Sequence, residues 1–275
     1  MKYVAYTLLT IIAFVLLLPT LLLMVGSIRV DDGLIGSVLE LIPREITFEN
    51  YERVFGYTIR LWTRNSIFTA VGAATLTAFV VMTAGYAFAK KPIPGKEFIF
   101  WTMLGAMMIP GTVTFVPMYV LMLKLDLLNT LWGIILPSGL QISYIFYMRQ
   151  FLSDLPDSFL DAAEIDGCGE LRTFAHIVVP LARPGLATIV LLTILGQWNS
   201  FLWPLTILFD REKFTLPVGI QQILFEDAIL KSGGRFEPQF GLMMAGGTYL
   251  MIPGIILFIV FNRYFVKGLW GGSMR

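Results

Sequence analysis

Long apolar runs separated by shorter polar segments set the pattern of this chain of 275 residues. Six of these runs contain no Asp, Glu, Lys or Arg, and they cover residues 3–28, 67–89, 98–123, 131–148, 186–209 and 240–261. A helix needs roughly 20 apolar residues to cross a hydrocarbon core about 30 Å thick, and it satisfies its own backbone hydrogen bonds there. The pattern therefore predicts an all-α membrane protein with six transmembrane helices.

Composition supports the same fold class. Charged residues make up 14% of the chain and the mean hydropathy is +0.75, whereas about a quarter of a soluble domain is charged. The first run is about twice as long as the 7–15 apolar residues of a signal peptide, so residues 1–28 are expected to remain as the first membrane helix. The single cysteine, Cys168, excludes an internal disulfide, and the single histidine, His176, argues against a metal site.

The distribution of Lys and Arg predicts the orientation in the membrane. The loop 90–96 carries three positive charges, against one (Lys124) in the next loop, and short loops weigh most in the positive-inside rule. We therefore expect both termini in the cytoplasm. The domains are then membrane helix 1–28, outer loop 29–66, three membrane helices within 67–148, inner loop 149–185, membrane helix 186–209, outer loop 210–239, membrane helix 240–261 and inner tail 262–275.

The inner loop is acidic, which the cytoplasmic side does not favour by default. From Phe151 onward, six carboxylates precede the first basic residue, Arg172: Asp154, Asp157, Asp161, Glu164, Asp166 and Glu170. Pro156 suits the first turn of a helix, and Asp157 there complements the positive end of the helix dipole. Gly167 is placed to end that helix in the left-handed conformation that glycine adopts at least cost.

The predicted loop helix is amphipathic. Asp157, Asp161 and Glu164 share one face, while Phe159 and Ala163 form an apolar stripe. A second short helix is expected to run over residues 170–179 and to stop at the proline at position 180, and a further proline at position 184 is expected to open the next membrane helix. The segment is thus predicted to be a helix, a glycine turn and a helix that engage a partner.

The order and spacing of these residues resemble a known family. The match runs Asp161-Ala162-Ala163, then Gly167, then Ile177-Val178-Val179-Pro180. This pattern resembles the cytoplasmic coupling loop of permease subunits in binding-protein-dependent ABC importers, with Asp161 in place of the usual Glu and Val179 in place of Leu. Further similarity at residues 47–51, 65–66, 92–96, 155–156, 163–167 and 197–205 is to the carbohydrate-importing branch, in particular to its shorter six-helix permease.

The resemblance implies a subunit that transports without chemistry of its own. It implies the type I ABC importer permease fold, a second permease subunit, a dimer of ATPase subunits, an external solute-binding protein and a location in a bacterial or archaeal inner membrane, with no nucleic acid partner. The chain contains no GxxxxGK[ST] loop, so no cofactor is expected on it, and ATP and Mg²⁺ belong at the ATPase. The residues expected to dock on the ATPase are Asp161, Ala162, Ala163, Glu164, Asp166, Gly167, Ile177 and Pro180. Residues 268–275 depart from the family tail, so no contact of the tail with the ATPase is implied.

The uncharged membrane runs bear on the solute. Ion-coupled carriers usually need a charged group within the membrane, and none is present, so a neutral, hydroxyl-rich solute fits better. Polar and aromatic candidates for its path are Gln141, Tyr144, Gln197, Trp198, Asn199 and Ser200. The same residue types also join helices in lipid. Alternatives are an ABC permease for a polyol phosphate, an osmolyte or an amino acid, and a stand-alone six-helix channel or carrier.

Prolines within the apolar runs are expected to bend the helices around a path. They are Pro110, Pro117, Pro137, Pro204 and Pro253.

Overall fold

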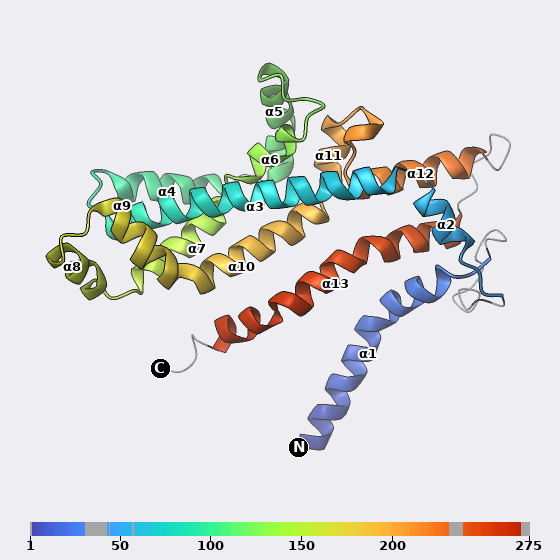
Figure 1. Ribbon diagram of the computed structural model, residues 1–275, viewed down its shortest axis with the longest axis horizontal. Coiled ribbons are helices and arrows are strands. Elements are labelled where there is room, and N and C mark those ends of the chain that lie inside the picture. The colour runs from blue at the N-terminus through green and yellow to red at the C-terminus, as the bar shows by residue number, and fades with distance from the viewer. Residues whose placement is uncertain (1, 31–42, 44, 57, 231–238, 271–275) are drawn as a thin grey trace. The chain divides into compact units, whose positions relative to one another are not determined.

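The fold is described from a computed structural model that describes residues 2–30, 43, 45–56, 58–230 and 239–270 (Figure 1). Parts of the predicted outer loops 29–66 and 210–239, and the end of the predicted tail 262–275, lie outside the described residues. The described part is helical, with one isolated β-bridge between Arg29 and Ile46. The chain divides into two compact units, Met1–Arg64 with Phe214–Ile256 and Asn65–Lys213 with Leu257–Arg275.

The first unit contains helices α1 (Lys2–Gly26), α2 (Glu49–Phe55), α12 (Leu216–Leu230) and the start of α13 (Phe240–Trp270). Of the residues of α1, only Gly26 is buried, as expected of a helix whose side chains face hydrocarbon. Asn50 on α2 is buried and donates from Nδ2 to the carbonyls of Ser27 (3.1 Å) and Arg29 (2.8 Å). The Tyr51 hydroxyl lies 2.7 Å from the Ser27 hydroxyl. The segment 47–51 therefore fixes the end of α1 against α2.

The second unit contains most of the helices. They are α3 (Ile59–Lys90, which begins in the first unit), α4 (Lys96–Ala106), α5 (Gly111–Lys124), α6 (Trp132–Ser138), α7 (Ile142–Ser153), α8 (Ser158–Ile165), α9 (Glu170–Thr173), the π-helix η2 (Phe174–Val178), α10 (Val179–Trp198), α11 (Leu202–Ile207) and the 3-10 helix η3 (Arg211–Lys213). In Figure 1, α3, α7 and α10 run side by side, with α8 and α9 at one end of them.

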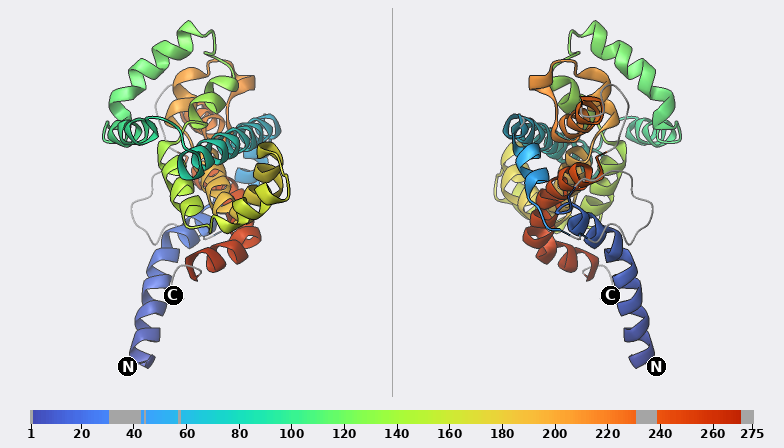
Figure 2. Two further views of the ribbon diagram at one scale, coloured as in Figure 1. Left: turned by 90° about the vertical axis from the view of Figure 1, so that its left-hand side faces the viewer. Right: turned by 90° about the vertical axis from the view of Figure 1, so that its right-hand side faces the viewer.

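The helix bounds differ from the apolar runs. Helix α3 begins at Ile59, not at 67, and the runs 98–123, 131–148 and 186–209 are each divided into two helices. Helices α4 and α5 meet at an angle of 103°, which Figure 2 shows as a sharp corner between the two green helices. Pro110 lies at that corner, directly before α5, and its backbone is extended (ψ 136°). Helix α4 ends before it because proline lacks an N–H and keeps the preceding residue out of the helical conformation.

The other prolines act less uniformly. Pro137 lies in the last turn of α6 and Pro204 in the first turn of α11, each beside a helix break. Pro117 and Pro253, also expected to bend their helices, lie inside α5 and α13, which continue past them. Membrane helices tolerate such prolines because neighbouring groups satisfy the freed carbonyls.

Three helices of the described part are long and apolar enough to cross a membrane. They are α1, α3 and the continuous helix Glu170–Trp198, and the bent pair α4 and α5 would make a fourth crossing. In α13, the apolar part whose side chains are described, Phe240–Ile256, is shorter than these helices. Six crossings remain the prediction from the sequence.

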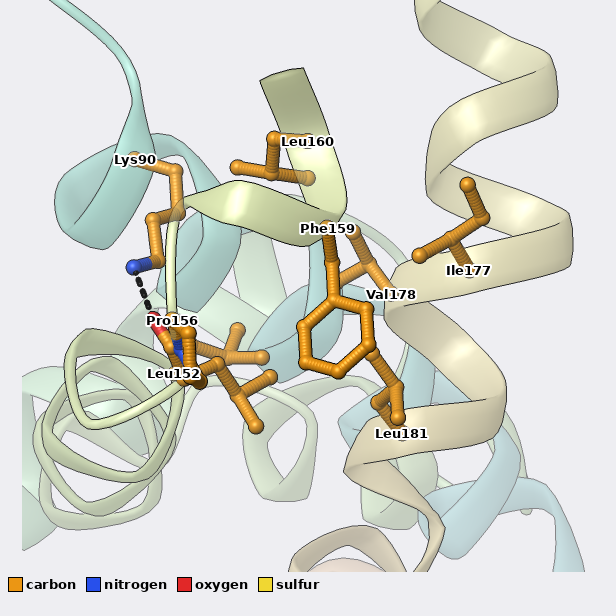
Figure 3. A pocket seen from close by; sticks show the side chains of 9 residues that line it. Lys90, Leu152, Pro156, Phe159, Leu160, Ile177, Val178 and Leu181 are labelled. Atoms are coloured by element: carbon orange, nitrogen blue, oxygen red, sulfur yellow. Dashed lines mark hydrogen bonds between the residues drawn. The ribbon is translucent and has the colours of Figure 1, made fainter. Parts of the chain in front are cut away.

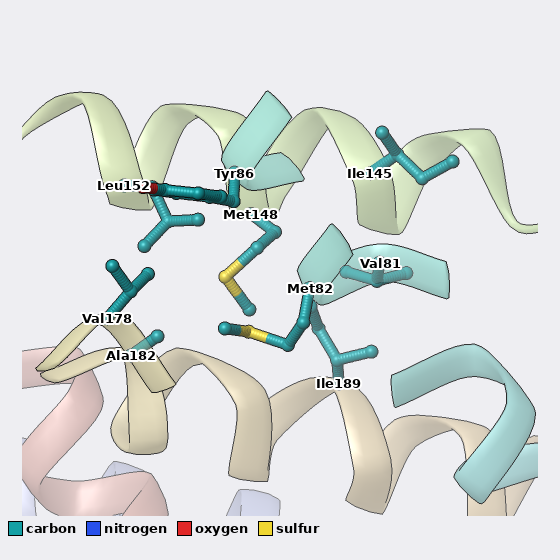
Figure 4. Close-up of a cluster of buried hydrophobic side chains, with 9 residues drawn as sticks. All are labelled: Val81, Met82, Tyr86, Ile145, Met148, Leu152, Val178, Ala182 and Ile189. Carbon is teal, nitrogen blue, oxygen red and sulfur yellow. The ribbon is translucent and has the colours of Figure 1, made fainter. Parts of the chain in front are cut away.

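Buried apolar side chains from α3, α7 and the start of α10 form one core within the second unit (Figure 4). It consists of Val81, Met82, Tyr86, Ile145, Met148, Leu152, Val178, Ala182 and Ile189. A Cβ added to Gly85 would lie only 2.7 Å from Cγ of Met148, so α3 and α7 approach closely here. This core holds the membrane ends of the inner loop in place.

Candidate functional site

Helix α8 ends in the glycine turn that the sequence predicts. Gly167 has φ +73°, in the left-handed region. The Gly167 N–H donates to the Glu164 carbonyl (3.0 Å) and the Cys168 N–H donates to the Ala163 carbonyl (2.9 Å). These two bonds make a Schellman motif, which satisfies carbonyls at the end of a helix. A Cβ on Gly167 would meet nothing within 4 Å, so the backbone conformation alone requires glycine here.

Most of the predicted docking residues of α8 are on the surface. Asp161, Ala162, Glu164 and Asp166 are exposed. Ala163 is the exception, because its side chain is only 3% exposed and packs inward. Its side chain therefore lies inside the protein and not on the exposed surface of α8.

Two exposed apolar residues accompany these carboxylates. Ile165 is 86% exposed and Leu171 is 83% exposed, the one just before the glycine turn and the other just after it. The sequence reasoning missed both. A signal was present, since each is a large apolar residue in a segment otherwise rich in charge.

A shallow apolar hollow lies beneath α8 (Figure 3). It is lined by Lys90, Leu152, Leu155, Pro156, Phe159, Leu160, Ile177, Val178 and Leu181, from α3, α7, α8 and the helix that leads into α10. Ile177, predicted to dock on the ATPase, is half-buried in its wall. Phe159 covers one side of the hollow, which agrees with the predicted apolar stripe of α8.

The second half of the loop differs from the prediction. Helix α9 begins at Glu170 as expected, but the helix does not stop at Pro180 and does not restart at Pro184. It passes through the π-helix η2 into α10, and Pro180 lies half-buried in the first turn of α10. The Val179 N–H donates to the carbonyl of Phe174, five residues earlier, which is the bond of a π-turn. The wider turn lies directly before Pro180, which has no N–H and so could not make the regular α-helical bond.

Two adjacent lysines at the end of α3 hold the loop. Lys90 Nζ lies 2.7 Å from the Leu155 carbonyl and 2.6 Å from Asp157 Oδ1, and the Lys90 side chain is 8% exposed. Lys91 Nζ lies 2.5 Å from Glu170 Oε2. The sequence identified these lysines only as markers of orientation, because their partners are more than 60 positions away along the chain.

The Lys91 contact has a further aromatic component. Lys91 Nζ also lies 5.1 Å from the centre of the Tyr86 ring. Burial by itself lowers the pKa of Lys91, but the hydrogen bonds with Glu170 and Tyr86 outweigh it and raise the pKa above its usual range. Lys91 is therefore charged at any physiological pH.

The candidate solute residues are not gathered in one place. Gln197 Oε1 accepts a hydrogen bond from the Ser138 hydroxyl (3.0 Å), while its buried Nε2 has no partner in the described part of the chain. Trp198 is only 3% exposed, so its ring packs inside the protein. Asn199 is exposed and donates to the Leu195 carbonyl (2.8 Å).

The remaining candidates lie on or beside two helix breaks, the one between α6 and α7 and the one between α10 and α11. Ser200 is half-buried, with its backbone N–H bonded to the Gln197 carbonyl. Gln141 is exposed at the start of α7, and Tyr144 is half-buried against the core. The breaks between α6 and α7 and between α10 and α11 are thus linked by the hydrogen bond between Ser138 and Gln197. In the described part of the chain, no group of three or more His, Cys, Asp or Glu residues is arranged to hold a metal ion.

Comparison with known proteins gives consistent matches. Residues 81–271 match the family model described as "Binding-protein-dependent transport system inner membrane component". An arabinooligosaccharides transport system permease protein of Halalkalibacterium halodurans is 35% identical over 268 residues, which cover 96% of this chain and 93% of the relative. An sn-glycerol-3-phosphate transport system permease protein of Yersinia pestis is 28% identical, with 92% of this chain and 90% of the relative covered.

A solved structure matches the fold over nearly its whole length. It is a chain of a bacterial ABC transporter involved in the import of the acidic polysaccharide alginate, with a TM-score of 0.81 and 26% identity. The match covers 96% of each chain.

Proposed function

We infer the role of the inner loop from one premise, which is that this chain belongs to the family of binding-protein-dependent transport system inner membrane components, the permease subunits of ABC importers. It is an all-α membrane protein and a transport component. We propose that it forms half of the translocation path for a carbohydrate and couples closure of an ATPase dimer to alternating access.

The observation that carries the coupling proposal is the exposed, acidic end of α8 with its glycine turn. Asp161, Glu164 and Asp166 offer carboxylates, and Ile165 and Leu171 add exposed apolar surface on either side of the turn. Large apolar side chains exposed to water on the cytoplasmic face favour a protein partner. We propose that carboxylates and apolar groups together enter a groove of the ATPase that has basic residues at its rim.

The residues expected to dock act in different ways in this proposal. Asp161 and Glu164 pair with basic groups, Ala162 allows close approach, and Gly167 fixes the turn. Ala163, which is buried, and Ile177 and Pro180, which are half-buried, support the docking surface from inside the protein. ATP and Mg²⁺ are held by the partner ATPase subunits.

The remaining partners follow from the family. We propose a second permease subunit as the other half of the path and an external solute-binding protein on the opposite face. The chain would lie in a bacterial or archaeal inner membrane, with both termini and the loop 149–185 in the cytoplasm and the loops 29–66 and 210–239 outside. Cysteine labelling from the two faces, with Cys168 first removed, tests this orientation.

Carbohydrate is the favoured solute class, because relatives named for oligosaccharide transport match nearly the whole chain. A polyol phosphate is the second candidate, since a similar relative is named for glycerol phosphate. The helix breaks joined by Ser138 and Gln197 are the favoured place for solute contact, because broken membrane helices expose backbone groups that bind solutes. The unpartnered Nε2 of Gln197 is a donor of the kind that a hydroxyl group can accept.

A matched pair of charge reversals tests the docking proposal. Glu164→Lys on the exposed face of α8 should weaken capture of the ATPase and reduce solute uptake by about tenfold or more, within the range of measured coupling energies. Asp154→Lys is the control, because Asp154 is an exposed acid of the same loop outside α8. Equal uptake and equal capture of the ATPase by both variants would contradict the docking proposal.

A further inference from the structure

The segments before and after α8 are fastened to two adjacent lysines, Lys90 as the last residue of α3 and Lys91 directly after it. Lys90 bonds to the Leu155 carbonyl and to Asp157, just before α8, and Lys91 bonds to Glu170, just after the glycine turn. Helix α8 lies between these two attachment points. The paired lysines therefore bracket the segment that would dock on an ATPase.

These attachments reach a helix that the loop does not join covalently. The chain runs from α7 directly into the loop and from the loop directly into α10. Helix α3 is separated from both in sequence, and side chains link it to the loop: the two lysines bond to it, the Tyr86 ring lies 5.3 Å from that of Phe174 in η2, and the apolar core packs loop residues against α3. Movement of α8 would reach α7 and α10 through the backbone, whereas it would reach α3 only through side-chain contacts, of which the two lysine bonds are the polar ones.

Burial distinguishes the two attachments. The Lys90 side chain is 8% exposed, and its ammonium has both a carboxylate and a carbonyl as acceptors. A buried charge that loses its acceptors is strongly disfavoured, so this bond should hold whenever the loop is in place. Lys91 is 33% exposed and Glu170 is 58% exposed, so this pair alone is weak and can adjust as the loop moves.

We propose that Lys90 and Lys91 are positioning residues that tie the docking segment to α3, so that displacement of α8 by the ATPase moves α3 together with α7 and α10. The inference rests on the proposed docking role of the loop. The core of α3, α7 and α10 favours such joint movement, because its side chains interlock the three helices as one packed body (Figure 4). Without the tethers, the loop could move while α3 lags behind.

The test separates coupling from assembly. The double variant Lys90→Met, Lys91→Met keeps most of the apolar part of each side chain and removes both charges. In complexes reconstituted with the co-purifying ATPase, second permease and solute-binding protein, we expect capture of the ATPase and basal hydrolysis to stay within about twofold. Solute transported per ATP hydrolysed should fall about tenfold, within the range of measured allosteric effects.

The acid on the partner side supplies a matched comparison. Glu170→Gln removes the acceptor of Lys91 at a side chain that is 58% exposed. Glu97→Gln is its control, since Glu97 is 56% exposed and pairs with Arg149 between α4 and α7, and neither residue lies in α8 or at its two attachment points. Glu170→Gln should lower the transport ratio and Glu97→Gln should leave it unchanged. Reversal of the pair, Lys91→Glu with Glu170→Lys, should restore part of the ratio.

The outcomes distinguish this inference from the proposed function. If the wild-type chain captures no ATPase, the docking role fails and the tether has no purpose. If the wild-type complex couples normally and the lysine variants and Glu170→Gln couple equally well, the tether is refuted while docking stands. Loss of ATPase capture in Glu170→Gln would also refute it, because the pair would then support assembly and not transmission.

Discussion

Replacing Gly167 by valine tests the inner loop at the point where its backbone is most constrained. Gly167 has φ +73°, and an L-residue in the left-handed region costs about 1–2 kcal/mol, with β-branched side chains at the upper end. A Cβ would meet nothing within 4 Å, so no steric clash adds to this cost. The penalty is purely conformational and falls on the turn.

A penalty of one or two kcal/mol changes the population of the turn by a factor of about 5–30. The alternative backbone would lose the Schellman bonds from Gly167 to Glu164 and from Cys168 to Ala163, which re-aims Leu171 relative to Ile165. The membrane core should survive, because none of its members belongs to the turn. Gly167→Val is therefore expected to insert normally but to lose ATPase capture and uptake by a factor of that size.

The neighbouring glycine gives the control. A Cβ added to Gly169 would also meet nothing within 4 Å, but the backbone of Gly169 is extended (φ −67°, ψ 157°), which any residue adopts. Gly169 is the N-cap of α9, where Thr is about as favourable as Gly, so Gly169→Thr should behave much like wild type. Gly167→Asn should be milder than Gly167→Val because Asn tolerates the left-handed region. The assays are uptake, solute-stimulated ATP hydrolysis and capture of the ATPase by the reconstituted complex. Wild-type values for Gly167→Val, or equal losses at positions 167 and 169, would refute the reasoning.

Two further predictions concern packing and pH. Gly85→Leu should lower the free energy of unfolding of the purified protein by about 1–3 kcal/mol, because the new Cβ would lie 2.7 Å from Cγ of the buried Met148. Gly105→Leu is the control, since a Cβ there would meet nothing within 4 Å. Equal melting temperatures of the two variants would contradict this prediction. Hydrogen bonds from Lys213 and then Asn129 lower the pKa of Asp210 from its ordinary 3.8, so the contribution of this carboxylate to stability is present above pH 3.8 and is lost as the pH falls through the lowered pKa. Protection factors for hydrogen exchange at residues 207–210, which correct for the intrinsic pH dependence of exchange, should fall only in that acid range, and Asp210→Asn should remove this fall.

The sequence predicted the first half of the inner loop well because its signals are local. Pro156 and Asp157 mark the start of α8 within two residues, and Gly167 takes the predicted left-handed conformation. A helix start and a glycine turn depend on the residues that form them and on their immediate neighbours. Short-range spacing was therefore sufficient here.

The second half was predicted incorrectly because a π-turn has no sequence signal comparable to proline. Pro180 and Pro184 normally end a helix, but packing of Val178, Ala182 and Ile189 on the core holds the helix together across them. Tertiary contacts of this kind outweigh local preferences, and they are not visible in a single sequence.

The lysine tethers and the buried position of Trp198 were missed for a related reason. Lys90 and Asp157 are 67 positions apart, and no local pattern links them. An indole in an apolar helix serves a solute path or a protein core equally well, and only the fold decides between them. The candidate solute residues therefore remain the part of the site that the sequence defines least.

The π-turn over Phe174–Val178 has a consequence for rotation about the helix axis. Each residue of an α-helix advances the side-chain direction by about 100°, and a π-turn holds roughly one residue more than an α-turn. Compared with an uninterrupted α-helix, the face of α10 that carries Gln197 is therefore rotated by about one residue relative to the face of α9 at the loop. The two faces can be set independently along one continuous backbone, so a single-residue deletion in this turn would rotate the face of α10 that carries Gln197 by about 100° while leaving every amino acid on it unchanged.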